Sequence, residues 1–115
     1  MVMPGDLNGA GTLFGGRCLA WVDEEAAIFA YCQLDTPRLV TAGMSAINFT
    51  SPAYQSNIVE IGCEVVRFGR TSITLKVVVR NKDTKKDILV VEEMTFVALD
   101  ENGRPTPHGK TEVKA

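Results

Sequence analysis

The chain has 115 residues, of which 45% are hydrophobic, and its formal net charge is −2 at pH 7. This length predicts a single domain whose core needs no disulfide, and the near-neutral charge argues against general nucleic-acid binding. No apolar run approaches the roughly 20 residues that span a bilayer, and the first residues lack the features of a signal peptide. We therefore expect a cytoplasmic protein that binds neither nucleic acid nor membrane.

The first third of the chain predicts a brief strand, a loop and one long helix. Residues 5–13 are rich in Gly, Asn and Asp, which favours a loop. From Phe14 to about Gln33, apolar residues recur at spacings of three and four, which predicts an amphipathic helix. The apolar face consists of Cys18, Leu19, Val22, Ala26, Phe29 and Ala30. Pro37 ends the helix, because the residue before a proline disfavours helical backbone angles.

After Pro37 the apolar period changes to two, which predicts strands. The expected strands are residues 38–49, 57–68, 71–81 and 87–99. Residues 68–70 and 82–86 are connections short enough for hairpins, and residues 105–115 form an expected extended or flexible tail. This order predicts an α+β class, with residues 1–104 as one domain in which an antiparallel sheet covers a single helix. One helix cannot cover both faces of such a sheet, so we expect a dimer or a larger assembly.

Two common kinds of active site find no support in the residues. A Ser-His-Asp or Cys-His arrangement needs a histidine to carry the proton, and the single histidine, His108, lies in the proline-containing tail. Cys18, Cys32 and Cys63 share no metal-binding spacing, so we expect small buried thiols and neither a disulfide framework nor a zinc site. No metal is predicted.

Positive charge is concentrated in one part of the chain. Between Arg67 and Lys86 there are seven Lys or Arg residues and one acid, a local charge of +6. Such a stretch suits a small polyphosphate ligand. Solvated lysines that protect strand faces and edges are an equally good interpretation.

Asp23 is the most informative polar residue of the predicted helix. A helical projection puts it beside Ala26 and Ala30, on or near the buried face. It lies about two turns inside the helix, too far in for an N-cap, and a buried carboxylate needs a partner or a function. The alternative is a position at the rim, in contact with water or a cation. The pattern alone leaves both readings open.

Two features next to the helix start add to this candidate site. Gly15 and Gly16 offer bare backbone N–H groups at the positive end of the helix dipole, where an anion or a developing oxyanion can bind. A tight entry turn is the commoner use of paired glycines. Asn8 can orient a water or a carbonyl, although asparagine in a loop more often closes a turn.

Several short motifs occur in an order that resembles a known family. They are Met3-Pro4, Asn8-Gly-Ala-Gly11, Phe14-Gly15-Gly16, Trp21-Val22-Asp23, residues 44–49 followed by Pro52, and residues 69–72. Together they resemble the hot-dog-fold acyl-CoA thioesterases, in particular the cytosolic acyl-CoA hydrolase branch. The matches extend nearly to Leu99. The first strand is shorter than is usual in that family.

The resemblance implies a hot-dog domain with a five-stranded antiparallel sheet wrapped around the helix, and hydrolysis of acyl-CoA to CoA and a carboxylic acid. Asp23 matches the catalytic general base or nucleophile, and Asn8 matches a residue contributed by the facing subunit. The Gly16 N–H would polarise the thioester carbonyl. The residues expected along the substrate are Gly15, Phe49, Gly69, Arg70, Thr71 and Ser72. No cofactor is implied, since CoA is part of the substrate, and the implied assembly is a homodimer within a hexamer, a trimer of dimers.

Two other functions compete with hydrolysis. A hot-dog dehydratase acting on acyl carrier proteins would use a histidine with a carboxylate, and the predicted helix has no histidine. A non-catalytic acyl-CoA-binding protein of the same fold is the second alternative. The presence of both Asp23 and Asn8 favours catalysis over it.

Overall fold

The computed structural model describes residues 1–114. Its elements are the 3-10 helix η1 (Pro4–Asp6), the helix α1 (Gly15–Leu34) and the strands β1 (Leu39–Met44), β2 (Ile47–Phe49), β3 (Val59–Phe68), β4 (Ser72–Asn81) and β5 (Asp87–Ala98). Every strand pair is antiparallel. The predicted α+β class is confirmed. None of the described helices is long and apolar enough to cross a membrane.

The amphipathic helix forms where the sequence predicted it. Its buried residues are Cys18, Val22, Ala26, Ala30, Gln33 and Leu34. Leu19 and Phe29 are partly buried and pack against the core, which confirms the predicted apolar face. The helix ends at Asp35, whose backbone is left-handed (φ 56°, ψ 33°) and whose N–H donates to the carbonyl of Tyr31 at 2.8 Å.

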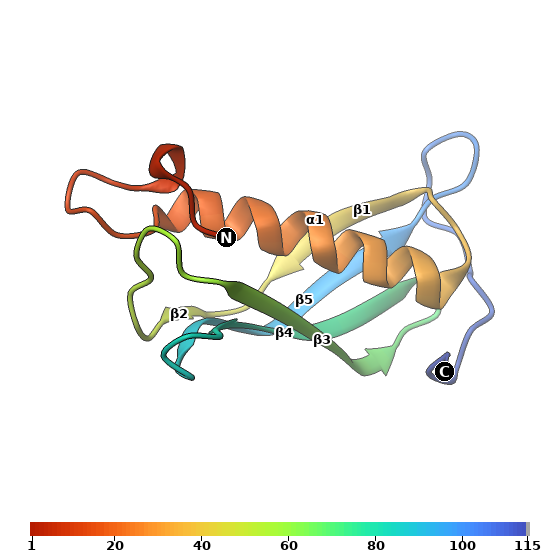
Figure 1. Ribbon diagram of the computed structural model, residues 1–115. Coiled ribbons are helices and arrows are strands. Elements are labelled where there is room, and N and C mark those ends of the chain that lie inside the picture. Colours follow the sequence, from red (N-terminus) through yellow and green to blue (C-terminus); the bar gives the residue numbers. More distant parts are fainter. Residues whose placement is uncertain (115) are drawn as a thin grey trace.

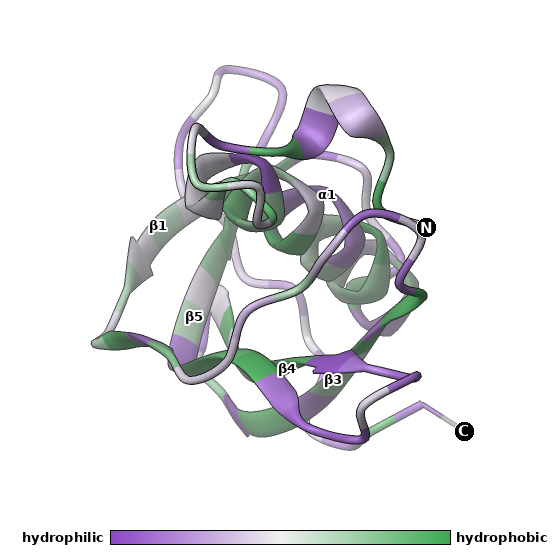
Figure 2. Ribbon diagram, turned by 60° about the vertical axis from the view of Figure 1, so that its left-hand side comes forward, coloured by the Kyte–Doolittle hydropathy of each residue, from purple (hydrophilic) through white to green (hydrophobic). Residues whose placement is uncertain are grey.

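The sheet curves around α1, as Figures 1 and 2 show from two directions. The strand order is β1-β5-β4-β3, and β2 pairs with β5 beside β1. Side chains of β4 and β5 that face α1 alternate with side chains on the outer face, as a period of two requires. The centre of the core contains Phe96, Ile73, Leu75, Leu89 and Met94, all fully buried.

The structure corrects two details of the predicted sheet. The strand expected at residues 38–49 is divided at Ser45, whose N–H donates to the carbonyl of Glu93 (2.8 Å) and whose hydroxyl accepts from the Glu93 N–H (2.9 Å). The N-terminal segment is not a strand: Val2 exchanges backbone bonds with Ser56 and Asn57, and η1 then begins at Pro4. Proline has no N–H to extend a ladder. The fifth strand is therefore β2.

The tail (residues 105–114) contains no helix or strand. It lies at the end of the molecule where α1 ends, as Figure 1 shows. The Thr106 N–H donates to the carbonyl of Ala98 at 2.9 Å, which ties the start of the tail to the end of β5. The division of the chain into a domain and a flexible tail stays a prediction.

Candidate active site

Asp23 lies on the exposed surface of α1, beside the edge strand β1. Its neighbours Val22 and Ala26 are fully buried, whereas Asp23 itself is exposed. Of the two positions that the sequence left open, the single chain has the exposed one, at the rim of the buried face. Successive helical residues are about 100° apart. Asp23 is therefore turned away from the face on which Val22 and Ala26 are buried, towards the flank of the helix next to β1.

Thr41 is the partner of this carboxylate. The Thr41 hydroxyl donates to Asp23 Oδ1 at 2.7 Å. Sequence reasoning missed Thr41, although a signal was present: it follows Leu39 by two residues in a strand, and Leu39 packs against the core. A period of two puts both side chains on the face towards α1. The hydrogen bond fixes the orientation of an otherwise exposed carboxylate.

The N-terminus of α1 is open. No hydrogen bond from the backbone N–H of Gly15 or Gly16 is found in the described part of the chain, and the first turn holds no acidic residue to neutralise the helix dipole. A Cβ at Gly16 would lie 2.8 Å from the ring of Phe14, and one at Gly15 would lie 3.2 Å from the ring of Phe49. The two glycines therefore leave room for two aromatic rings beside exposed backbone donors.

A pocket of about 460 Å³ opens at this helix end. Three predicted site residues, Asn8, Gly15 and Phe49, line it together. The other lining residues are Thr12, Leu13, Cys18, Thr50, Ser51, Pro52, Ala53 and Ile88. Buried apolar residues thus lie against the backbone donors of the helix start.

Asn8 closes its own loop. Its side-chain oxygen accepts from the N–H groups of Ala10 (2.9 Å) and Thr12 (3.1 Å), and its Nδ2 donates to the Thr12 hydroxyl at 3.0 Å. These are turn contacts. An amide nitrogen has two hydrogens, so Asn8 has a second donor in addition to the one bound to Thr12.

The predicted substrate segment at residues 69–72 forms the tight turn between β3 and β4. The Gly69 N–H donates to the carbonyl of Ser72 at 2.9 Å, and the carbonyl of Thr71 accepts from the Ala98 N–H at 2.8 Å, which joins the turn to β5. A Cβ at Gly69 would collide with the hydroxyl of Ser72, which favours glycine at this position. Arg70 is exposed and makes no ion pair with the described residues.

The cysteines have three different environments. Burial raises the pKa of Cys18 to about 11, so this thiol stays protonated at neutral pH. Burial and the nearby Glu25 carboxylate raise the pKa of Cys63. Cys32 is exposed, so the expectation that all three are buried is wrong there. Within residues 1–114 no group of His, Cys, Asp or Glu side chains is arranged to hold a metal ion.

Comparison with known proteins then identifies the family. Residues 10–88 match the model of the thioesterase superfamily. The chain belongs to this superfamily. It is 35% identical over 111 residues to YkhA of Bacillus subtilis, whose name describes it as an acyl-CoA thioester hydrolase. That alignment covers 92% of this chain and 63% of the relative, so this chain spans less than two thirds of the length of YkhA.

Solved structures confirm the hot-dog fold and the predicted resemblance. A hexameric hotdog fold thioesterase of Campylobacter jejuni superposes with a TM-score of 0.79 at 29% identity, over 93% of this chain and 84% of that one. An acyl-CoA hydrolase from Staphylococcus aureus, in complex with butyryl coenzyme A, coenzyme A and coenzyme A disulfide, gives a TM-score of 0.82 at 33% identity. Here 93% of this chain and 64% of that chain are covered.

In a single copy of this chain, the predicted site residues form three groups. Asn8, Gly15, Gly16 and Phe49 lie at the start of α1, and Asp23 lies further along the helix, which rises about 10 Å from Gly16. The 69–72 turn lies at the opposite end of the molecule (Figure 1). One copy therefore does not bring the three groups together.

Proposed function

We propose that the chain is an acyl-CoA thioesterase that hydrolyses acyl-CoA to CoA and a carboxylic acid. Membership of the thioesterase superfamily and relatives named acyl-CoA thioester hydrolases support this. One observation supports the mechanism. The helix α1 carries the Asp23 carboxylate, which accepts a hydrogen bond from Thr41 of β1, and the same helix presents unpaired N–H groups at its start. Release of CoA from a panel of acyl-CoAs is the direct test.

Asp23 acts on the thioester carbon in one of two ways. As a general base it removes a proton from water, whose oxygen attacks the carbon while the C–S bond breaks and the CoA thiolate takes up a proton. As a nucleophile its own oxygen attacks, CoA leaves, and water hydrolyses the resulting anhydride. In both routes the Gly16 N–H donates to the carbonyl oxygen as negative charge develops on it.

Two copies are needed for one site. Asp23 and the open helix start are about 10 Å apart along one helix, so the carboxylate acts on a carbonyl bound at the helix start of the facing copy, together with Asn8 of that copy. The surface around Asp23 suits such a partner. Two exposed apolar side chains of α1, Ile28 and Tyr31, line a pocket together with Leu39 of β1, on the flank of the helix next to this strand. β1 pairs only with β5 among the described strands, so one edge is free to pair with another chain.

The assembly we propose is a hexamer, a trimer of such dimers. The Campylobacter jejuni relative is itself described as hexameric. A second copy over Asp23 would also remove water from the carboxylate, which strengthens electrostatic interactions inside the site.

Thr41→Val should lower kcat by roughly 10- to 150-fold and leave KM nearly unchanged. Valine has the shape of threonine but no hydroxyl, and a hydrogen bond to a charged group contributes roughly 1.5–3 kcal/mol. Steady-state CoA release measures the effect. Thr41→Ser is the matched control, because it retains the donor and should retain most of the rate. Equal rates for the valine and serine variants would show that the bond to Asp23 is not used.

Arg70→Ala should raise KM for acyl-CoA by about tenfold with little change in kcat, a loss of roughly 1.4 kcal/mol of binding. A contact made equally in the ground and transition states affects KM alone. The defect should shrink for a short thioester that lacks the nucleotide. Arg80 is an exposed cation of the same basic stretch, and Arg80→Ala is the control, which should leave KM unchanged. Equal defects on both substrates would indicate a structural role for Arg70.

The dehydratase alternative gains no support, because His108 lies in the tail and its ring is bonded to the carbonyl of Ser72. The non-catalytic alternative is favoured only by the turn contacts that occupy Asn8. CoA release separates it from the proposal: a binding protein would retain CoA affinity and show no turnover.

A further inference from the structure

Asn8 belongs to a short hairpin, residues 7–13, that precedes α1. Leu7 and Leu13 pair in an antiparallel bridge at its base, and the Leu13 N–H donates to the carbonyl of Ala53 at 2.7 Å. The tip of the hairpin is exposed. The position of Asn8 relative to the helix start therefore depends on how the base of the hairpin is held.

Asp6 connects the two sides of this base. Its carbonyl accepts from the N–H of Phe14, the residue before α1, at 2.8 Å. Both oxygens of its carboxylate are engaged: Oδ2 accepts from the Met3 N–H at 2.8 Å, and Oδ1 lies 3.3 Å from Nε of Arg17. The Asp6 side chain is only 16% exposed. Asp6 thus joins η1, the base of the hairpin and the first turn of α1.

Arg17 lies in the first turn of α1, where a cation is unfavourable. The backbone N–H groups there already form the positive end of the helix dipole, so an acidic side chain would be the stabilising one. Asp6 supplies that negative charge from outside the helix. Its carboxylate pairs with Arg17 beside the helix start and does not cap it, since the N–H groups of Gly15 and Gly16 bond to none of the described residues.

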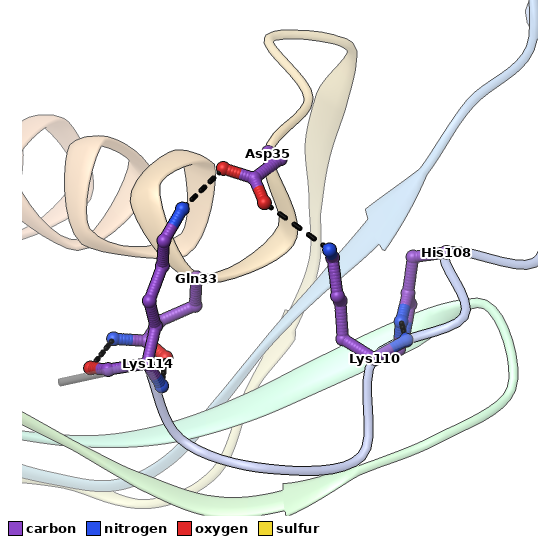
Figure 3. A network of polar contacts seen from close by, with 5 residues as sticks. All are labelled: Gln33, Asp35, His108, Lys110 and Lys114. Carbon is purple, nitrogen blue, oxygen red and sulfur yellow. Dashed lines mark hydrogen bonds and ion pairs between the residues drawn. The ribbon is translucent and has the colours of Figure 1, made fainter.

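The opposite end of α1 has the ordinary arrangement of charges. Two cations of the tail, Lys110 and Lys114, pair with the Asp35 carboxylate at 3.2 and 2.6 Å, as Figure 3 shows. Cations next to the last turn of a helix are stabilising. These ion pairs are roughly 30 Å from the helix start along a helix of this length. They stabilise the helix end without contact with the hairpin, which makes Asp35 a suitable comparison for Asp6.

We propose that Asp6 and Arg17 are positioning residues for the reaction. Their contact fixes the hairpin, and with it Asn8, relative to the Gly16 N–H, so that both groups reach one thioester carbonyl. This rests on the proposed acyl-CoA thioesterase function. Asn8 and Gly15 line the same pocket, so a change in the tilt of the hairpin alters the site. A misplacement of about 1 Å can lower a rate on the order of 100-fold, whereas a partly exposed ion pair contributes little to stability.

Steady-state CoA release by the full chain, together with thermal unfolding, tests the pair. Asp6→Asn keeps an oxygen that accepts from the Met3 N–H and removes the charge that holds Arg17. Arg17→Met keeps the length of the side chain and removes its charge. Each change should lower kcat by about tenfold, leave KM nearly unchanged and shift the unfolding temperature only slightly. The double variant should be no slower than either single variant, because both changes remove the same contact.

Two further variants separate positioning from a general effect on the fold. Arg17→Lys should retain most of the rate, because a lysine can still pair with the Asp6 carboxylate. Asp35→Asn makes the same acid-to-amide change in the ion pairs at the far end of α1, and asparagine tolerates the left-handed backbone of that position. Its kcat should equal that of the wild type.

The outcomes separate this proposal from the proposed function. Losses that multiply in the double variant would show that Asp6 and Arg17 act independently. That result, wild-type kcat in both single variants, or an equal loss in Asp35→Asn would overturn the positioning pair, while turnover by the wild type left the proposed function intact. A wild-type chain that releases no CoA from acyl-CoA would remove the proposed function and the positioning role together. If Asp6→Asn does not fold, the Arg17 variants decide, because that side chain is 49% exposed.

Discussion

Asp23→Asn is expected to lower kcat for acyl-CoA by about 10²–10⁴-fold, with more if the carboxylate is the nucleophile. Asparagine keeps the size of the side chain and an oxygen that can accept from the Thr41 hydroxyl. It can neither take a proton from water at neutral pH nor attack the thioester. The side chain is exposed in the single chain, so the variant should fold like the wild type. CoA release under saturating substrate gives kcat, and thermal unfolding checks the fold.

Glu24→Gln is the matched control for this experiment. It makes the same chemical change one residue further along α1, on another exposed side of the helix. It should keep a near-normal rate. A well-folded Asp23→Asn protein with near-normal turnover would remove Asp23 from the mechanism, and similar losses in both variants would indicate a general effect of charge.

A monomeric form of the chain is expected to be inactive, since we propose that Asp23 and Asn8 act on one substrate from different copies. Mixed subunits test this directly. Random pairing of Asn8→Ala with Asp23→Asn chains makes about half of the dimers mixed, and one of the two sites in each mixed dimer has both native groups. About a quarter of the wild-type sites should therefore return. Each variant alone should stay nearly inactive.

The mixing experiment has a clear contrary result. If Asp23 and Asn8 acted within one copy, no mixed dimer would have an intact site, and mixing would restore nothing. Full activity in a fraction shown by sedimentation to be monomeric would contradict the shared site in another way. Complete subunit exchange is checked with differently labelled chains before the activities are compared.

Local patterns predicted most of the fold. The 3.6-residue period from Cys18 to Ala30 and the two-residue period of β4 and β5 depend on which faces are buried, and burial is what the apolar pattern records. The division at Ser45 was not predictable. Its cause is a pair of hydrogen bonds with Glu93, forty-eight residues away, and no local pattern contains them.

The candidate site was predicted less completely, for related reasons. The motifs pointed to Asp23 and the glycines of the helix start, because carboxylates and bare N–H groups have recognisable chemistry. Thr41 is a common residue on an edge strand, and its role depends on its 2.7 Å contact with α1. The pairing of Asp6 with Arg17 depends on the fold of the hairpin between them, which the apolar pattern does not record.

The central position of β5 also constrains how the chain acquires its structure. β1, β2 and β4 all hydrogen-bond to β5, yet β5 is the last strand in the sequence. During synthesis, β1 and β2 therefore have no strand to pair with until residues 87–98 have left the ribosome. Contacts between such distant segments make folding slow relative to helical proteins, and unpaired strand edges exposed in the meantime favour aggregation. The helix made early in synthesis stays without its complete sheet until nearly the whole domain is present.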